Sequence, residues 1–473
     1  MKQNLVFKYF TEICKIPHVS GHEQKLALYI VNLLKKNKCK VITDKLGNIY
    51  ASKNGPLKVP SICFQAHLDM VGEKTIDSKH NFKTDPIDYY EDSGWIKAKG
   101  TTLGADNGVG LALILALLTD VKVEHGPLEA VFTVEEETTT IGAIKLNRDW
   151  IQSPYLINVD SESDNNIIIG SGYCCDFNGF VPLNRIARKD GTVDLSVRIM
   201  NGNGGHSGID IHKSVVNTVV EMFNILKNIS NKYKFQLIDI KTSQQLNLIP
   251  PHCEVIINLE QRNVNQFKKT FLSNFNVLFN IYETTEKHLS LVINTVKASQ
   301  NPLTYDDTTK LINLLIAVNN GLNNFDNYFG IPHTSTNLGQ IVLQPTEARF
   351  SWLQRAANEY DINKLNNKLS ALFSLVGGSS KTVNFCNGLI GSLNNRLALF
   401  IQHLAKEKFN HFTKLSQIHA VLEIGEIVKH YPNITAVSIG ANIENPHTTK
   451  ERTEIKSILY TYELIKEIVK TIK

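Results

Sequence analysis

A histidine and an aspartate stand one residue apart at the end of an apolar segment, as His67 and Asp69 in QAHLDMV. In a strand, residues i and i+2 point to the same face. Asp69 could therefore approach the site of His67 and hold its imidazole in one tautomer, as carboxylates do for metal-binding histidines. Alone this pair is a weak signal, because a strand often ends in exposed polar residues.

Carboxylates follow two further apolar or glycine-rich segments. Asp106 lies in GTTLGADNGVG, a turn that precedes an apolar helix, where a helix cap is the plain alternative. Glu135, Glu136 and Glu137 follow the apolar segment LEAVFTV. Adjacent carboxylates repel one another unless a cation or solvent compensates. An ordinary solvated loop is the alternative for these three residues.

Two more candidates come later in the chain. Asp160 ends the segment LINVD, and His447 lies in NPHTTKE, after the segment TAVSIG. Singly, each is more readily structural than functional. Together, all these side chains supply nitrogen and oxygen ligands suited to Zn²⁺ or similar ions, enough for two ions that share one aspartate. Such a pair can activate a water and polarise a carbonyl, while one unligated glutamate accepts the proton of the water.

These residues need a scaffold that brings segment ends together. Helical spacing predicts helices over residues 4–14 and 23–35, and short apolar runs predict buried strands in SICFQAHLDMV, LEAVFTV and LINVD. Helices between strands predict a mostly parallel or mixed sheet that is covered on both faces. Ligands bind beyond the carboxyl ends of strands in such sheets. Residues 108–118 are too few to span a bilayer, which takes ~20 residues, and predict a buried helix.

The pattern changes after about residue 184. It predicts a strand over 194–200, a glycine-rich turn NGNGGHSG, a helix over 214–229, strands in KFQLIDI and CEVIINL, and then a long helix rich in Asn and Lys. A second α/β layer is therefore expected from about 185 to 390. The remaining chain returns to helix–strand alternation that ends in TYELIKEIVKTIK.

Composition excludes several other classes of protein. In 473 residues, 50 Lys and Arg stand against 45 Asp and Glu, with no dense basic block, so neither nucleic acid nor a membrane surface is an expected partner. Seven cysteines without a C-x-x-C pair argue against a disulfide framework and a zinc knuckle. The first residues lack the apolar core of a secretory signal, and we expect a cytoplasmic location.

The chain resembles the M20 metallopeptidases, most closely their aminoacyl-histidine dipeptidase branch. The matching segments run in order from near residue 10 to near residue 455: KIPHVSGHEQKLALYI, GNIYASK, CFQAHLDMV, KTDPI, IKAKGTTLGADNGVGLAL, HGPLEAVFTVEEE, LINVDSES, GGHSGIDIH, NLIP, HAVLEIG, VSIG and NPHTTKE. The resemblance implies an α/β fold. A discontinuous, mixed-sheet, zinc-peptidase-like catalytic domain would comprise residues 1–184 and 391–473, with residues 185–390 inserted as a large α/β lid domain.

The resemblance also implies two divalent metal ions, with Zn²⁺ expected and Co²⁺ or Mn²⁺ as alternatives that suit the same ligands. One ion would be held by His67, Asp106 and Asp160. The other would be held by Asp106, Glu137 and His447, so that Asp106 bridges the two.

Catalytic and substrate-binding roles follow from the same resemblance. Asp69 would orient the first metal-binding histidine, and Glu136 would be the general base that passes a proton from water to the leaving amine. His206 of GGHSG would stabilise the oxyanion. Asn247 of NLIP and Arg355 of SWLQRA would hold the substrate, and the guanidinium fork of Arg355 suits a C-terminal carboxylate. Without the family context, His206 would be a turn residue and Arg355 a surface charge.

Some positions depart from the family pattern. Thr138, Thr139 and Thr140 stand where a small residue and glycine are usual, Val421 replaces glycine in HAVLEIG, and Lys450 replaces an acidic residue in NPHTTKE. No implied ligand or base is lost, so catalysis is expected. The side-chain preference stays open.

The expected function is that of a metal-dependent dipeptidase, with Xaa-His dipeptides among its substrates. The alternatives are another M20 hydrolase, such as an N-acyl-amino-acid deacylase or a tripeptidase, and an inactive relative that only binds metal. The retained Glu136 speaks against the inactive relative. The chain is expected to be a monomer or a homodimer, since a long lid can supply its histidine within one chain.

Overall fold

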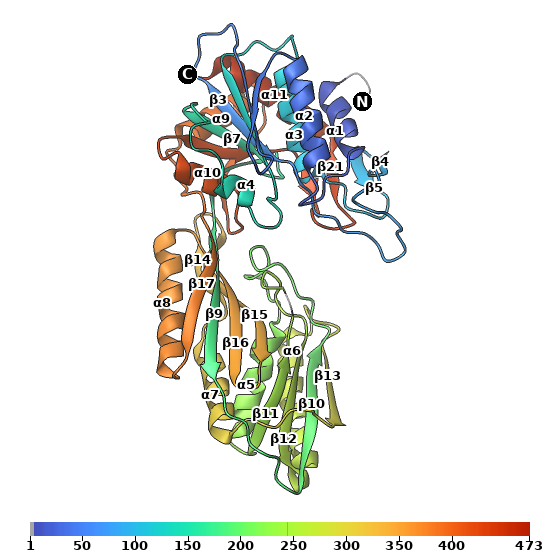
Figure 1. Ribbon diagram of the computed structural model, residues 1–473, viewed down its shortest axis with the longest axis vertical. Coiled ribbons are helices and arrows are strands. Elements are labelled where there is room, and N and C mark those ends of the chain that lie inside the picture. Colours follow the sequence, from blue (N-terminus) through green and yellow to red (C-terminus); the bar gives the residue numbers. More distant parts are fainter. Residues whose placement is uncertain (1–3, 244) are drawn as a thin grey trace. The chain divides into compact units, whose positions relative to one another are not determined.

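The computed structural model describes residues 4–243 and 245–473, which form two compact units (Figure 1). The first unit comprises Met1–Ser171, Gly388–Ile418 and Leu422–Lys473, and the second comprises Gly172–Asn387 and His419–Val421. The second unit starts at Gly172 rather than near residue 185 because β9 (Tyr173–Pro182) pairs with two of its strands, β16 (Glu347–Ala356) and β17 (Ser379–Cys386). Separate catalytic and lid roles for the two parts stay a prediction.

An eight-stranded sheet forms the centre of the first unit, and its parallel and antiparallel pairs confirm the predicted mixed sheet. Its order is β1-β2-β6-β3-β7-β19-β8-β18. These strands are β1 (Lys40–Thr43), β2 (Ile49–Lys53), β6 (Leu128–Thr133), β3 (Ile62–His67), β7 (Tyr155–Val159), β19 (Thr435–Ile439), β8 (Asn166–Ser171) and β18 (Lys414–Ile418). The three strands predicted in SICFQAHLDMV, LEAVFTV and LINVD are the neighbours β3, β6 and β7. They run parallel, so their carboxyl ends meet at one edge of the sheet.

Helices pack on this sheet and on one another. They are α1 (Leu5–Cys14), α2 (Gln24–Lys36), α3 (Ala105–Thr119), α4 (Ile141–Ile144), α9 (Arg396–Phe409), α10 (Ile424–His430) and α11 (Ile455–Thr471). Every residue of α3 is buried, because the helix contacts β3, β6 and β7 as well as α1, α2 and α11. An all-round apolar sequence needs such an environment, and the predicted buried helix is confirmed. In the described chain, no helix has the length and apolar character needed to cross a bilayer.

A small second sheet fixes the last part of the chain within the first unit. Its order is β20-β21-β5-β4, and its strands are β20 (Ile443–Glu444), β21 (Arg452–Glu454), β5 (Trp95–Ala98) and β4 (Tyr89–Asp92). Pairing of β21 with β5 places the segment between β20 and β21 beside the turn that precedes α3. The segment between β20 and β21 contains His447.

The second unit contains two antiparallel sheets, of order β11-β12-β10-β13 and β14-β15-β16-β9-β17. Its remaining strands are β10 (Thr192–Met200), β11 (Phe235–Lys241), β12 (Cys253–Glu260), β13 (Ser290–Val296), β14 (Gly321–Asp326) and β15 (Ile331–Leu343). Its helices are α5 (Thr218–Ser230), α6 (Val264–Tyr282), α7 (Tyr305–Ala317) and α8 (Glu359–Leu375), with a 3₁₀ turn at Gln261–Asn263. The predicted helix over 214–229 begins four residues late, because the Asn217 side chain caps it by accepting from the main-chain N–H groups of Val219 and Val220.

A tightly packed aromatic core generates a stability prediction for the second unit. A Cβ atom on Gly179 of β9 would lie 2.2 Å from Cζ of Phe373, whose ring is fully buried against Phe177 and Trp352. Gly179→Ala should destabilise this unit by about 1–3 kcal/mol, because a close-packed core cannot accept another methyl group. The measurement is the urea midpoint of unfolding. In a Phe373→Leu background, Gly179→Ala should reduce the free energy of unfolding by less. An equal reduction in both backgrounds would contradict the predicted contact.

Candidate metal centre

The carboxyl ends of three parallel strands bring predicted ligands together. His67 is the last residue of β3 and pairs in register with Thr133, the last residue of β6. The glutamates at 135–137 follow β6, and Asp160 follows β7. The parallel arrangement therefore joins segments that are far apart in the sequence.

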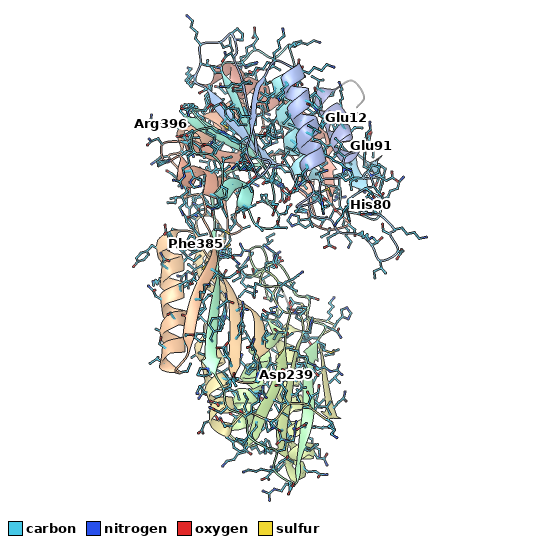
Figure 2. All side chains as sticks on the ribbon, viewed as in Figure 1. Glu12, His80, Glu91, Asp239, Phe385 and Arg396 are labelled. Atoms are coloured by element: carbon cyan, nitrogen blue, oxygen red, sulfur yellow. The ribbon has the colours of Figure 1, made fainter. Side chains whose placement is uncertain are left out.

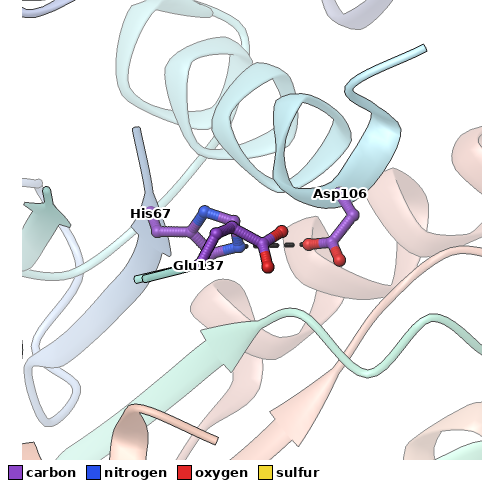
Figure 3. A group of neighbouring side chains, drawn as sticks. All are labelled: His67, Asp106 and Glu137. Atoms are coloured by element: carbon purple, nitrogen blue, oxygen red, sulfur yellow. Dashed lines mark hydrogen bonds and ion pairs between the residues drawn. The ribbon is translucent and has the colours of Figure 1, made fainter. Parts of the chain in front are cut away.

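Asp106 contacts both candidate histidines, and Figure 3 shows it with His67 and Glu137. His67, Asp106 and Glu137 each place one ligand atom within 4.8 Å of the others. Nε2 of His67 lies 3.0 Å from Oδ1 of Asp106, and Nε2 of His447 lies 3.2 Å from Oδ2 of the same carboxylate. His447 also lies 3.0 Å from Oε1 of Glu137, and Oδ1 of Asp160 lies 3.7 Å from Nε2 of His67. The two oxygens of Asp106 thus face different histidines, as a bridging ligand requires.

The centre carries buried negative charge that its own groups only partly balance. Burial raises the pKa of Glu136 and of Asp160 well above the usual carboxyl range, and neighbouring carboxylates add to the effect. Burial lowers the pKa of His67, but Asp160, Asp106 and Asp69 outweigh it and raise the pKa well above its usual value. Burial lowers the pKa of His447 too, but Asp106 and Glu137 raise it to about 11. A divalent cation bound among these groups would supply positive charge that favours the ionised carboxylates and the neutral histidines.

Asp69 makes more contacts than the sequence predicted. Nδ1 of His67 lies 3.5 Å from Oδ1 of Asp69 and 3.0 Å from the Asp69 main-chain oxygen. The Asp69 carboxylate also accepts from Oγ of Ser20 at 2.7 Å, and from the main-chain N–H groups of Glu136 and Glu137 at 2.9 and 3.1 Å. Asp69 therefore contacts one candidate ligand directly and fixes the backbone of the next.

The three adjacent glutamates occupy different environments. Glu135 has a left-handed backbone, with φ +53°, and its carboxylate accepts from Oγ1 of Thr139 at 3.2 Å. Glu137 contacts His447, as described above. In the described chain, the carboxylate of Glu136 makes no hydrogen bond. The turn thus separates one carboxylate that bonds within the loop, one that contacts His447 and one that makes no hydrogen bond within the described residues.

Glu451 holds the turn that carries Asp106, and sequence reasoning missed it. This fully buried carboxylate accepts from the four successive main-chain N–H groups of residues 103–106, at 2.7, 2.9, 2.8 and 3.2 Å. Glu451 follows His447 by four residues, so one short segment supplies a candidate ligand and fixes the backbone of another. An acidic residue near a candidate histidine was the only sequence signal available.

A second buried carboxyl lies beneath the centre. Glu423, next to α10, accepts from Oγ1 of Thr133 at 2.8 Å and from the side-chain amide of Gln65. Gln65 in turn accepts from Nδ2 of Asn158 at 2.7 Å. Burial raises the pKa of Glu423 to about 7. Through these contacts Glu423 joins β3, β6 and β7 shortly before each strand reaches the candidate ligands.

The other three predicted residues lie in the second unit and are neighbours there. The main-chain N–H of His206 donates to Asp210 at 2.8 Å, and the main-chain oxygen of Asn247 accepts from the main-chain N–H of Ser207 at 2.8 Å. A Cβ on Gly208 would lie 3.1 Å from both Cζ of Arg355 and Cε1 of His206, so the guanidinium and imidazole flank this glycine. Arg355 is 5% exposed, and in the described chain its Nε has no hydrogen-bond partner and its guanidinium no ion pair. A buried cation of this kind suits an anionic ligand.

His419 lies beside Arg355 and was not singled out from the sequence. Its Nε2 lies 2.7 Å from Oγ of Ser335, which is the register partner of Arg355 on the neighbouring strand. Burial lowers the pKa of His419 to about 3, and Arg355 adds to this effect. His419 is therefore neutral and leaves the charge of Arg355 undiminished.

Comparisons with known proteins identify the family of the chain and proteins that resemble it. Residues 63–471 match the peptidase family M20/M25/M40. The chain is 33% identical to the cytosol non-specific dipeptidase of Escherichia coli (strain K12), over 98% of this chain and 96% of that protein. It is similar in structure to an aminoacylhistidine dipeptidase from Vibrio alginolyticus, with a TM-score of 0.85, 28% identity, and coverage of 99% and 96% of the two chains. A Staphylococcus aureus tripeptidase shares the fold at a TM-score of 0.58 and 17% identity.

The contacts of Glu451 generate a prediction about metal binding. Glu451→Gln would present an amide NH₂ group to main-chain N–H donors and loosen the turn that carries Asp106. We expect the affinity for Zn²⁺ to fall about 10–100-fold, as it does when partners of metal ligands are lost. A chelating dye that competes for Zn²⁺ measures the affinity. Glu444→Gln is the matched control, because Glu444 lies in the same segment but pairs with Arg452 at the surface. Equal Zn²⁺ affinity in folded wild type and Glu451→Gln would contradict the role of Glu451.

Proposed function

The chain belongs to the peptidase family M20/M25/M40, and from this premise we propose that it is a metal-dependent dipeptidase. The observation that carries the proposal is the cluster of two histidines and acidic residues around Asp106. Two relatives that match nearly the whole chain are named as dipeptidases, which supports dipeptides as the substrate class. We propose that Xaa-His dipeptides are among a broader range of dipeptide substrates, in line with the names of both relatives. We also propose a cytosolic location, in line with the name of the Escherichia coli relative.

The donor set fits two divalent cations. Imidazole nitrogens and carboxylate oxygens suit Zn²⁺, Co²⁺ and Mn²⁺, and we propose Zn²⁺ as the ion. His67, Asp106 and Asp160 would hold one ion, and Asp106, Glu137 and His447 the other. When bound, such ions polarise the substrate carbonyl and lower the pKa of water.

Glu136 is the proposed general base. Its carboxylate lies among the candidate ligands without a hydrogen bond of its own in the described chain, and its main-chain N–H is fixed by Asp69. A carboxylate in this position accepts a proton from the attacking water and then donates it to the nitrogen of the leaving amino acid. Asp69 acts on the reaction through His67 and through the backbone of the glutamates.

The proposed substrate contacts come from the second unit. Arg355 would bind the C-terminal carboxylate of a dipeptide, which is supported by its buried guanidinium and unpartnered Nε. Asn247 would hold the same end of the substrate, and His206 would stabilise the negative charge that develops on the carbonyl oxygen. We propose that His206 acts within its own chain, in a monomer or in a homodimer with self-sufficient sites.

An assay of substrate classes with and without chelator tests the proposed function. The purified protein should hold close to two divalent ions per chain and cleave dipeptides faster than N-acyl amino acids, tripeptides or amidated dipeptides. A chelator should abolish the activity, and added Zn²⁺ should restore it, because the buried carboxylates need the cations. Rapid cleavage of N-acyl amino acids with no cleavage of dipeptides would favour a deacylase. A metal-loaded protein without hydrolytic activity would instead indicate an inactive relative.

The three glutamates provide a test of individual roles. Glu136→Gln preserves shape but removes the proton acceptor, and kcat should fall by about 10²–10⁴-fold while two ions stay bound. Glu137→Gln should weaken one metal site, with activity partly recovered at high metal concentration. Glu135→Gln is the matched control and should change little, because its carboxylate bonds Thr139. Metal analysis and kcat of the three variants decide the assignment. If Glu136→Gln loses metal while Glu135→Gln is inactive but keeps its metal, the assignment of base and ligand must shift by one residue.

A further inference from the structure

A cavity of about 590 Å³ lies beside the candidate metal centre, within the first unit. Glu137 and Thr138 line one side of it, and Ser20 and Met70 line another. Glu137 contacts His447, and Ser20 donates to Asp69, so the cavity is continuous with the residues of the centre. Its volume is ample for one amino-acid side chain and falls in the usual range of small-molecule sites.

The rest of the lining comes largely from the segment that follows Met70. Thr102 donates its main-chain N–H to the oxygen of Glu73 at 2.8 Å, and Thr75 donates to the oxygen of Gly100 at 3.0 Å. Farther on, the ring of His80, labelled in Figure 2, packs edge-on against Phe82 at 4.5 Å. The two main-chain hydrogen bonds tie the segment to residues 100–102, between β5 and the turn that carries Asp106, and so fix one wall of the cavity.

The cavity has an apolar floor and a basic rim. Val19, Met70 and Phe82 supply apolar surface, and a Cβ on Gly72 would lie 3.0 Å from Val19 and 3.1 Å from Phe82, so the floor is closely packed. The rim contains three lysines, Lys74, Lys79 and Lys83, and the lining also contains the carboxylates of Glu73 and Glu137.

The rim lysines make no direct contact with a carboxylate in the described chain. Nζ of Lys74 donates to the main-chain oxygen of His80 at 2.7 Å, and Asp85 is near enough for a charge interaction with Lys74 but forms no ion pair with it. Within the described ranges, none of the three lysines forms an ion pair with a carboxylate. A ligand group with an apolar stem and an anionic end matches this combination of floor and rim.

We propose that this cavity binds the side chain of the substrate and that it favours acidic side chains, those of glutamate and aspartate. This inference rests on the proposed dipeptidase function. The methylene groups of glutamate match the apolar floor, and its carboxylate can pair with the rim ammonium groups, which form no ion pair within the described residues. Thr138, which departs from the family pattern, lies in the same lining. The main-chain carboxylate of a dipeptide is an anion too, and the experiment separates these two sources of negative charge.

The test compares kcat/KM for Ala-Ala, Glu-Ala, Ala-Glu, Lys-Ala and Ala-Lys. At one of the two positions, kcat/KM for the glutamate-containing dipeptide should be about tenfold higher than kcat/KM for the lysine-containing dipeptide. A tenfold ratio is what one charge-assisted contact is expected to contribute. In Lys79→Gln/Lys83→Gln this ratio should fall toward one, mainly through KM, and Lys79→Glu/Lys83→Glu should invert it. Lys74 is kept because it ties the segment together. Lys58→Gln/Lys122→Gln removes two exposed, unpaired lysines outside the cavity and should leave the ratio unchanged.

Two outcomes would overturn the inference while leaving the proposed function intact. One is Ala-Ala hydrolysis by the wild type without any preference for the acidic dipeptides. The other is an equal loss for all five dipeptides in the Lys79 and Lys83 variants, since that would assign the lysines to the main-chain carboxylate shared by all five. Failure of the wild type to cleave any of the five would reject the proposed function itself. Metal content and circular dichroism confirm that each variant is folded.

Discussion

Mutual repulsion between buried carboxylates is the constraint on which the rest of this structure depends. Asp106, Glu136, Glu137 and Asp160 converge where little water reaches them, and burial, with repulsion from neighbouring carboxylates, raises the pKa values of Glu136 and Asp160. Two histidines supply the nearest positive charge. A protein keeps such an arrangement only if rigid elements hold each carboxylate in place, and the parallel strands β3, β6 and β7 provide this by ending at one edge of the sheet.

Two further carboxyls, Glu451 and Glu423, reinforce that arrangement without being candidate ligands. Glu451 accepts four successive main-chain N–H groups, so its charge is spread over backbone dipoles at the turn before α3. Glu423 instead joins side chains of neighbouring strands. Buried polar groups that are hydrogen-bonded in this way fix one geometry, because any displacement would leave a buried group unpaired.

Local patterns in the sequence predicted the elements that carry the centre. The continuous apolar runs became β3, β6, β7 and the fully buried α3, and His67 and Asp106 lie within hydrogen-bonding distance. Contacts between distant segments were not predictable. Nothing in the sequence showed that Glu451 would reach the turn before α3, or that β9 would join the second unit by pairing with β16 and β17. The basic rim of Lys74, Lys79 and Lys83 was also not predicted. In the sequence, three separated lysines are typical of a solvated surface, and only the fold shows that they line one cavity.

The order of segments along the chain has a consequence for biosynthesis. His447 is 341 residues from Asp106 in the sequence, and Glu451 lies beyond it. A ribosome therefore makes the whole second unit and most of the first before it makes His447 and Glu451. His447 faces the second oxygen of Asp106, and Glu451 holds the turn that carries Asp106. A nascent chain, or one shortened by proteolysis before residue 447, contains the acidic groups and His67 but lacks His447 and Glu451. The arrangement around Asp106 is therefore complete only after the segment that contains these two residues has been made.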